Sequence, residues 1–137
     1  MWSGAFGTNV DVLSRAMDVS VLRRNVIANN IANAETPNFK RTVVNFEAEL
    51  GKALASRDTQ ALPQLITDPR HIAFHQPRDY RDVQPRRVLD YLTTARNNGN
   101  NVDVEVESMA LLENQLLYQT LATAISSEYS RINIVLR

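Results

Sequence analysis

One stretch, residues 28–40, constrains the fold more than any other part of the chain. It reads Ala-Asn-Asn-Ile-Ala-Asn-Ala-Glu-Thr-Pro-Asn-Phe-Lys, and it follows apolar residues that recur at helical spacing. That spacing predicts a helix over residues 9–34. Pro37 ends it, because proline has no N–H to donate and disfavours the helical conformation of the residue before it. Pro37 and Asn38 suit the central positions of a type II turn, since asparagine tolerates the positive φ that the second position needs.

Three asparagines precede this turn, Asn29, Asn30 and Asn33. Asparagine has a low helix propensity, and its amide costs free energy if it is buried without a partner. The amides are either solvated at a fraying helix end or bonded to the turn's backbone and to a packed neighbour. Spacing alone leaves both interpretations open.

A second long helix is predicted from residue 104 to the end of the chain. The run Asn97–Asn101 around Gly99 indicates a turn with residues at positive φ. Asp103 then suits the N-cap, and Glu105 and Glu107 place negative charge in the first turn, where the helix dipole favours it. A heptad seam runs along this helix. Its apolar members are Val104, Leu111, Tyr118, Ala122, Ile125, Tyr129, Ile132 and Leu136.

The two helices predict a mainly α fold, an antiparallel coiled-coil hairpin with a short, loop-rich middle. An extended piece at 40–45 and a short helix at 46–55 are expected, the helix with Phe46, Leu50 and Leu54 on one face. From Ser56 to Pro85 no regular period persists, and four of the five prolines fall there. Short strands are possible at 72–75 and 88–92. The predicted organisation is a helical part from residues 1–40 and 101–137, and a middle of residues 41–100.

Residues 1–8 are mostly small, and we expect them to be mobile in a free monomer. Their only bulky side chains are Trp2 and Phe6. The two aromatic side chains are either incidental or anchors on a neighbouring subunit, since large aromatics dominate interface energies.

Composition excludes several classes of function. Fifteen basic and fifteen acidic residues give no net charge and no reason to expect a nucleic-acid or acidic-membrane partner. The absence of cysteine excludes disulfides, thiolate metal sites and cysteine nucleophiles. No G-x-S-x-G elbow or glycine-rich phosphate loop is present, so we expect no enzyme, cofactor or small-molecule substrate. No signal peptide or membrane-spanning run is recognised.

One arrangement hints at metal chemistry, formed by Asp68, His71, His75 and Asp79. Histidines four residues apart share a face if they are helical, which is how many zinc sites begin. However, prolines bracket the segment, no H-E-x-x-H occurs and no third ligand has convincing spacing. We therefore expect two histidines in a structured loop. A histidine-dependent metalloenzyme is kept as an alternative that elemental analysis would decide.

Residues 28–40 resemble the signature A-N-N-I-A-N-A-x-T-P-G-[YF]-K of bacterial flagellar axial proteins, which follows the first helix of rod, hook and hook-associated members. Glu35 fills the variable position, Phe39 is a permitted aromatic, and Asn38 replaces the usual glycine, a mild departure at positive φ. Residues 100–119 are similar to the family's C-terminal signature, which begins N-N-V-D-x-E-x-E. Two motifs in the right order are far more specific than one. The short middle resembles that of the small proximal rod proteins; one of these matches best, and its sister protein is the main alternative.

The resemblance implies a structural subunit of the basal-body rod. Its terminal helices would form the inner layer of a helical tube around the export channel, with the middle facing outward, and the rod would transmit torque. The implied partners are further copies of the chain, other rod proteins, the ring-to-rod adaptor and the flagellar type III export apparatus. The protein would reach the periplasmic rod without a cleaved signal peptide. The residues expected to determine assembly are Asn29, Asn30, Asn33, Pro37, Phe39, Asn101, Asp103, Glu107, Asn114, Tyr118, Ile125, Tyr129, Ile132 and Leu136.

Physical reasoning from the helices also favours assembly. Each apolar face is wider than a two-helix seam requires, and leftover apolar surface favours association. Contacts that do not close produce a helical filament. The helices are expected to be only partly formed in the monomer, because isolated helices are marginal. An export-associated coiled-coil binding protein is the alternative from another class, but it has no reason to carry both asparagine motifs.

Overall fold

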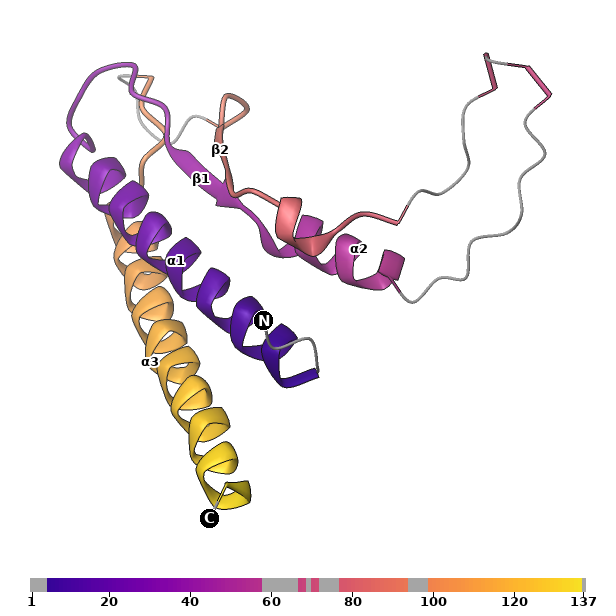
Figure 1. Cartoon of the computed structure of the whole chain (residues 1–137). Helices are drawn as coiled ribbons and strands as arrows, with labels where there is room; N and C mark the ends of the chain where they lie inside the picture. The colour runs from indigo at the N-terminus through magenta and orange to yellow at the C-terminus, as the bar shows by residue number, and fades with distance from the viewer. Residues whose placement is uncertain (1–4, 58–66, 69, 72–76, 94–98, 137) are drawn as a thin grey trace. The chain divides into compact units, whose positions relative to one another are not determined.

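The computed structural model describes residues 5–57, 67–68, 70–71, 77–93 and 99–136 (Figure 1). The fold is mainly helical. Along the chain, the elements are α1 (Ala5–Ala32), β1 (Thr42–Asn45), α2 (Glu47–Arg57), the 3-10 helix η1 (Tyr80–Asp82), β2 (Arg86–Leu89) and α3 (Val104–Val135). The chain divides into two compact units, Met1–Val44 with Arg87–Arg137, and Asn45–Arg86.

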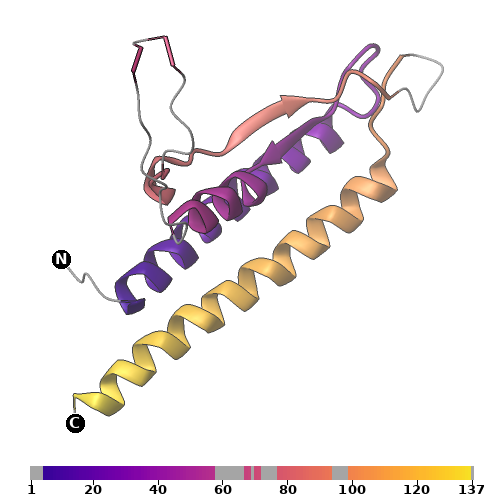
Figure 2. The same ribbon diagram turned by 90° about the vertical axis from the view of Figure 1, so that its right-hand side faces the viewer.

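The first unit is built on an antiparallel pair of long helices. α1 and α3 lie side by side in both views (Figures 1 and 2). Ser20 bonds Asn114 in the middle of the pair, and Asn30 bonds Glu107 near the end where α3 begins. The predicted hairpin is therefore confirmed.

The N-terminal end of α1 differs from expectation. The helix begins at Ala5, four residues before the predicted start at residue 9. The reason lies in α3, where the Tyr129 ring meets the Phe6 ring edge-on with centroids 6.2 Å apart. An aromatic partner far along the chain cannot be read from the small residues around Phe6. Trp2, the other aromatic of this segment, lies outside the described residues.

The seam between the helices is phased differently from the predicted heptad. The two α3 side chains that are fully buried are polar, Glu107 and Asn114, whereas Tyr118, Tyr129 and Leu136 of the predicted seam are 40%, 53% and 74% exposed. The other members of that seam are half-buried, namely Val104, Leu111, Ala122, Ile125 and Ile132. α3 carries apolar residues on most of its circumference, so periodicity cannot select one face. Hydrogen bonds to the buried polar side chains select it.

The turns at the end of the hairpin where α1 ends and α3 begins agree with the sequence. Asn38 has φ 59°, and the Phe39 N–H donates to the Thr36 carbonyl oxygen at 3.4 Å, as in a turn centred on Pro37 and Asn38. Gly99 has φ 78° in the asparagine-rich turn before α3. Asp103 caps α3, since its carboxylate accepts the Glu105 N–H at 2.9 Å.

β1 and β2 form a two-stranded sheet. The residue before β1 bonds the residue after β2, through the Asp90 N–H and the Arg41 carbonyl oxygen at 3.0 Å, so the strands are antiparallel. β2 overlaps the strand predicted at 88–92 but lies two to three residues earlier. The strand considered at 72–75 lies outside the described residues.

The second unit packs α2 against η1. Phe46, Leu50 and Ala53 are buried, whereas Leu54, predicted on this face, is half-buried. α2 continues to Arg57, two residues beyond the predicted end. Tyr80 of η1 is also buried, which gives this unit a small core of its own.

Across the described part of the chain, no helix combines the length and the apolarity that a membrane crossing requires.

Candidate functional site

Asn30 joins the first helix to the sheet. Its side-chain amide donates to the Thr42 carbonyl oxygen at 2.9 Å, and its carbonyl oxygen Oδ1 accepts the Thr42 N–H at 3.0 Å. The amide thus bonds Thr42 as a neighbouring strand would. Asn30 is almost fully buried, so the interpretation that its amide is bonded to a packed neighbour is confirmed for this residue.

Glu107 links Asn30 of α1 and Arg41, the residue before β1, to α3. Its side chain is 1% exposed; Oε2 accepts a hydrogen bond from Asn30 Nδ2 at 3.0 Å, and Oε1 lies 3.0 Å from Nη2 of Arg41. A buried carboxylate requires such partners, because removing it from water is costly. Helix, strand and helix therefore meet in one polar cluster of Asn30, Arg41 and Glu107.

Asn101 extends the sheet beyond its strands. Its Oδ1 accepts the Arg41 N–H at 2.7 Å, and its Nδ2 donates to the Asp90 carbonyl oxygen at 2.7 Å and to Thr93 Oγ1 at 3.1 Å. The side chain is buried between the start of β1 and the residues that follow β2. Asn101 therefore holds both strands at one end of the sheet, beside the N-terminus of α3.

Asn100 caps the end of α1. Its Nδ2 lies within hydrogen-bond distance of three carbonyl oxygens, those of Asn33, Ala34 and Thr36, at 3.0–3.1 Å. Its Oδ1 accepts the Val102 N–H at 2.6 Å. These carbonyl groups belong to the turn that follows α1, and a side chain from the second motif supplies their hydrogen-bond donor. The two asparagine motifs thus form one joint.

The remaining residues of the first motif are nearer the surface. Asn33 donates from Nδ2 to the Asn29 carbonyl oxygen at 2.8 Å, and its Oδ1 accepts from Thr36 Oγ1 at 3.4 Å. Asn29 and Pro37 are exposed, and Phe39 is half-buried. These residues shape the turn rather than the buried cluster.

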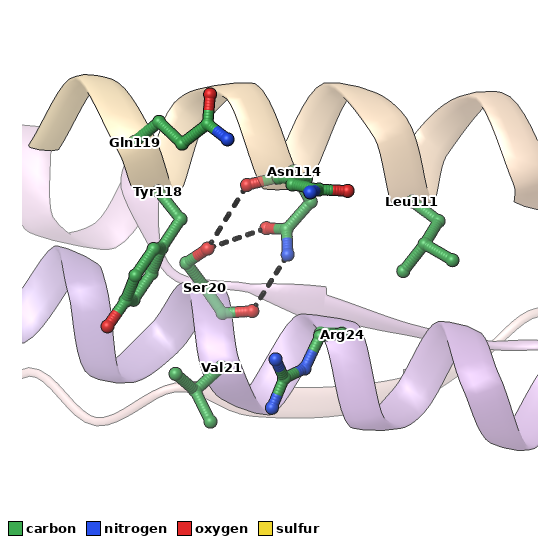
Figure 3. A pocket seen from close by; sticks show the side chains of 8 residues that line it. Ser20, Val21, Arg24, Leu111, Asn114, Tyr118 and Gln119 are labelled. Carbon is green, nitrogen blue, oxygen red and sulfur yellow. Dashed lines mark hydrogen bonds between the residues drawn. The ribbon is translucent and has the colours of Figure 1, made fainter.

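A second polar pair lies one-third of the way down the hairpin. The Ser20 hydroxyl donates to Asn114 Oδ1 at 3.0 Å, and Asn114 Nδ2 donates to the Ser20 carbonyl oxygen at 2.9 Å (Figure 3). Both residues are buried. With the Asn30–Glu107 bond, this pair fixes the register of α1 against α3, because a helical slip would leave buried polar groups unpaired.

A groove of about 570 Å³ opens beside this pair. Val21 and Arg24 line it from α1, and Leu111 and Tyr118 line it from α3 (Figure 3). Tyr118 and Val21 are both partly exposed to solvent. The groove therefore offers apolar surface from Val21, Leu111 and Tyr118, one cationic side chain, and the neutral polar side chains of Ser20, Asn114, Gln115 and Gln119.

The outer surface of α3 exposes large apolar side chains along its length. They are Val106, Met109, Leu112, Leu116, Leu117, Tyr118, Tyr129, Ile134, Val135 and Leu136. So many exposed apolar side chains on one helix mark an interaction surface more readily than scattered single ones.

The histidine arrangement offers no such geometry. His75 lies outside the described residues, and within the described ones no three His, Asp or Glu side chains are grouped as a metal would need.

In the second unit, the pKa of Glu49 lies below its usual value, because Lys52 donates a hydrogen bond to it at 2.9 Å and adds positive charge nearby.

Sequence reasoning missed three residues of the joint and the hairpin: Ser20, Arg41 and Asn100. Ser20 and Arg41 belong to residue types that are usually solvated on a helix or strand, and their partners lie 66 or more positions away. Asn100 stood in the second motif, and its position before a helix start was the available signal.

The comparisons with known proteins agree with this geometry. The family described as flagella basal body rod protein matches residues 11–40. The chain is 42% identical to the flagellar basal body rod protein FlgB of Borreliella burgdorferi, over 96% of this chain and 98% of that protein. It is 39% identical to FlgB of Borrelia hermsii over the same shares, and 31% identical to FlgB of Bacillus subtilis over 96% and 95%.

These relatives carry the name FlgB, which favours that protein over its sister FlgC, the alternative left by the motifs. Their likeness extends over both helices and the middle, far beyond the 30 residues that match the family model. The chain belongs to the FlgB family of flagellar basal body rod proteins, a family of structural proteins and not of enzymes.

Proposed function

We propose that this rod subunit polymerises through α1 and α3 into the helical tube of the proximal rod, which encloses the export channel and transmits torque. One observation carries the proposal. The α1–α3 hairpin leaves an apolar outer face on α3, with Met109, Leu112 and Leu116 each more than half exposed. A hairpin that acted alone would not require it.

The exposed side chains contribute a favourable free energy to association. Burying a large apolar side chain fully contributes about 1.5–3 kcal/mol. Because these three are already partly covered, their remaining burial contributes on the order of 1 kcal/mol each. A contact of about 3 kcal/mol is weak for a dimer, but a filament repeats it at every subunit.

The candidate residues divide into three groups under this proposal. Asn30, Asn101, Glu107 and Asn114 are buried within the chain, so they act on assembly by holding the hairpin in one register. A second group contacts neighbours directly, and it comprises the exposed residues Asn29, Pro37, Asp103, Tyr118, Tyr129 and Leu136. Asn33, Phe39, Ile125 and Ile132 are half-buried, and we assign them to the edges of those contacts.

Membership of the family supports a proposed location and a proposed set of partners. We place the subunit in the periplasmic part of the basal body, where it would contact copies of itself, other rod proteins and the ring-to-rod adaptor. It would leave the cytoplasm through the flagellar type III export apparatus without a cleaved signal peptide. Residues 41–100 would face away from the channel. Long helices that gain burial from neighbours are compatible with export through a narrow channel followed by ordering on assembly.

Hydrogen exchange tests the proposal. Purified chain and chain in isolated basal bodies are exchanged in parallel and compared peptide by peptide. We expect α3 to gain strong protection in the basal body, with α1 gaining less. Peptides from α2 serve as the internal control. Absence of the chain from purified rods, together with its recovery on exported proteins, would instead identify the coiled-coil binding protein considered from the sequence.

A further inference from the structure

We infer that the outer stripe of α3, formed by Met109, Leu112 and Leu116, docks into the α1–α3 groove of a second copy of this chain. The inference rests on the proposed function and adds which face of one subunit meets which face of the next. The two surfaces in this contact are different, a stripe on one subunit and a groove on the next.

The stripe is exposed and continuous. Its members are 66%, 59% and 55% exposed, and their spacing of three and four residues places them on one side of the helix. At 100° per residue, that side is turned roughly 150° away from Glu107 and Asn114, which face α1. The stripe therefore cannot be covered by α1 of its own chain.

The groove matches the stripe in length. Its α3 wall extends from Leu111 to Gln119, which is about 12 Å along the helix axis. The stripe from Met109 to Leu116 extends about 10 Å. The apolar walls, Val21, Leu111 and Tyr118, suit the apolar stripe, as Figure 3 shows for the side chains that line the groove.

The charges of the two surfaces are complementary. Glu105 lies one turn before Met109 in line with the stripe, and Glu113 lies beside it; both are exposed. The sequence of α3 has no lysine or arginine before Arg131. The groove carries one charged side chain, the exposed Arg24. Among the described residues, none of these three charges forms a salt bridge, so each is available to a partner.

The arrangement of the two surfaces determines the form of the assembly. Stripe and groove both involve α3, so a subunit cannot fill its own groove with its own stripe. Each subunit offers one stripe and one groove, and the contact leaves one of each free. Such a heterologous contact extends into a filament unless its rotation closes a ring.

Two variants of the full chain test the contact. A groove variant carries Val21→Glu and Arg24→Glu, and a stripe variant carries Leu112→Glu and Leu116→Glu, so that the two altered surfaces repel each other in the mixture. Sedimentation equilibrium is measured over a range of concentrations for the wild-type chain, each variant and their equimolar mixture. Circular dichroism checks that the helices remain.

We expect the wild-type mass to rise with concentration, whereas each variant alone stays at the monomer mass. The mixture should reach twice the monomer mass and stop there, because the intact stripe of one variant fills the intact groove of the other. A matched control, Ser127→Glu with Ser130→Glu, places the same charges further along the same face and should associate as the wild type does.

Three results would overturn the inference. The groove variant could associate alone as strongly as the wild type, which would indicate a stripe-to-stripe contact. The mixture could remain monomeric while the wild type associates. The wild type could itself stay monomeric at every concentration. Presence of the wild-type chain in purified basal bodies is measured separately. That measurement tests whether the chain is part of the rod, whatever the sedimentation experiment shows about this contact.

Discussion

Replacing Glu107 by alanine tests whether the polar cluster holds the hairpin together. In the folded chain, this buried carboxylate accepts a hydrogen bond from Asn30 Nδ2 at 3.0 Å and lies 3.0 Å from Arg41 Nη2. Glu107→Ala removes both interactions at once. We expect a substantial loss of stability, because three elements depend on the one side chain.

The magnitude follows from the two contacts. A hydrogen bond to a charged group contributes about 1.5–3 kcal/mol. The ion pair adds about 0–1 kcal/mol, because Arg41 keeps 28% of its side chain exposed and can turn its charge to water. Glu107→Ala should therefore lower the free energy of unfolding by about 2–4 kcal/mol, a large part of the 5–15 kcal/mol typical of a small domain.

Urea unfolding of the purified chain, followed by far-ultraviolet circular dichroism, measures this loss. Glu113→Ala is the matched control, since this glutamate is exposed on the same helix and should change the free energy by less than about 0.5 kcal/mol. A double-mutant cycle with Asn30→Ala should give a coupling of about 0.5–3 kcal/mol. Equal effects of Glu107→Ala and Glu113→Ala, or zero coupling, would show that the cluster does not stabilise the monomer.

Two glycines and one carboxylate provide further predictions. Gly99→Ala should lower the free energy of unfolding by more than about 1 kcal/mol, because Gly99 has φ 78° and an added Cβ would lie 2.5 Å from Asn38 Oδ1. Gly51→Ala should instead stabilise α2 by about 0.5–1 kcal/mol, since nothing lies within 4 Å of its added Cβ; urea unfolding of both variants would contradict this reasoning if they shifted in the same direction. Lys52→Gln should raise the pKa of Glu49 toward its usual value in an NMR titration, because Lys52 is the main cause of the lowered pKa. The stabilisation from this pair is present above the pKa of the unfolded chain and is lost as the pH falls through the lower folded value; an unchanged titration of Glu49 in Lys52→Gln would exclude the contact.

Local chemistry made part of the fold predictable. The turn at Pro37 and Asn38, the positive φ of Gly99 and the capping of α3 by Asp103 each depend on residues adjacent in sequence. The two long helices have strong patterns, and their pairing follows from the need to bury apolar faces. The starts and ends of the helices were less accurate, because distant contacts such as that of Phe6 with Tyr129 decide them.

The internal face of α3 could not be predicted from hydrophobicity. Its apolar residues surround most of the helix, so several phases of the heptad bury similar area. The choice is made by polar side chains, Glu107 and Asn114, whose partners Asn30 and Ser20 lie on the other helix. Pairings across 77 and 94 positions leave no local signal in a single sequence.

Neutral amides make the part of the joint that holds the turn after α1 and the end of the sheet, apart from the Arg41–Glu107 contact. Asn33, Asn100 and Asn101 bond backbone groups without carrying a charge. Amide side chains do not titrate, and dissolved salt screens charges far more than it weakens neutral hydrogen bonds. The contacts made by Asn100 and Asn101 should therefore keep their geometry in acidic or saline surroundings that would weaken the Arg41–Glu107 contact.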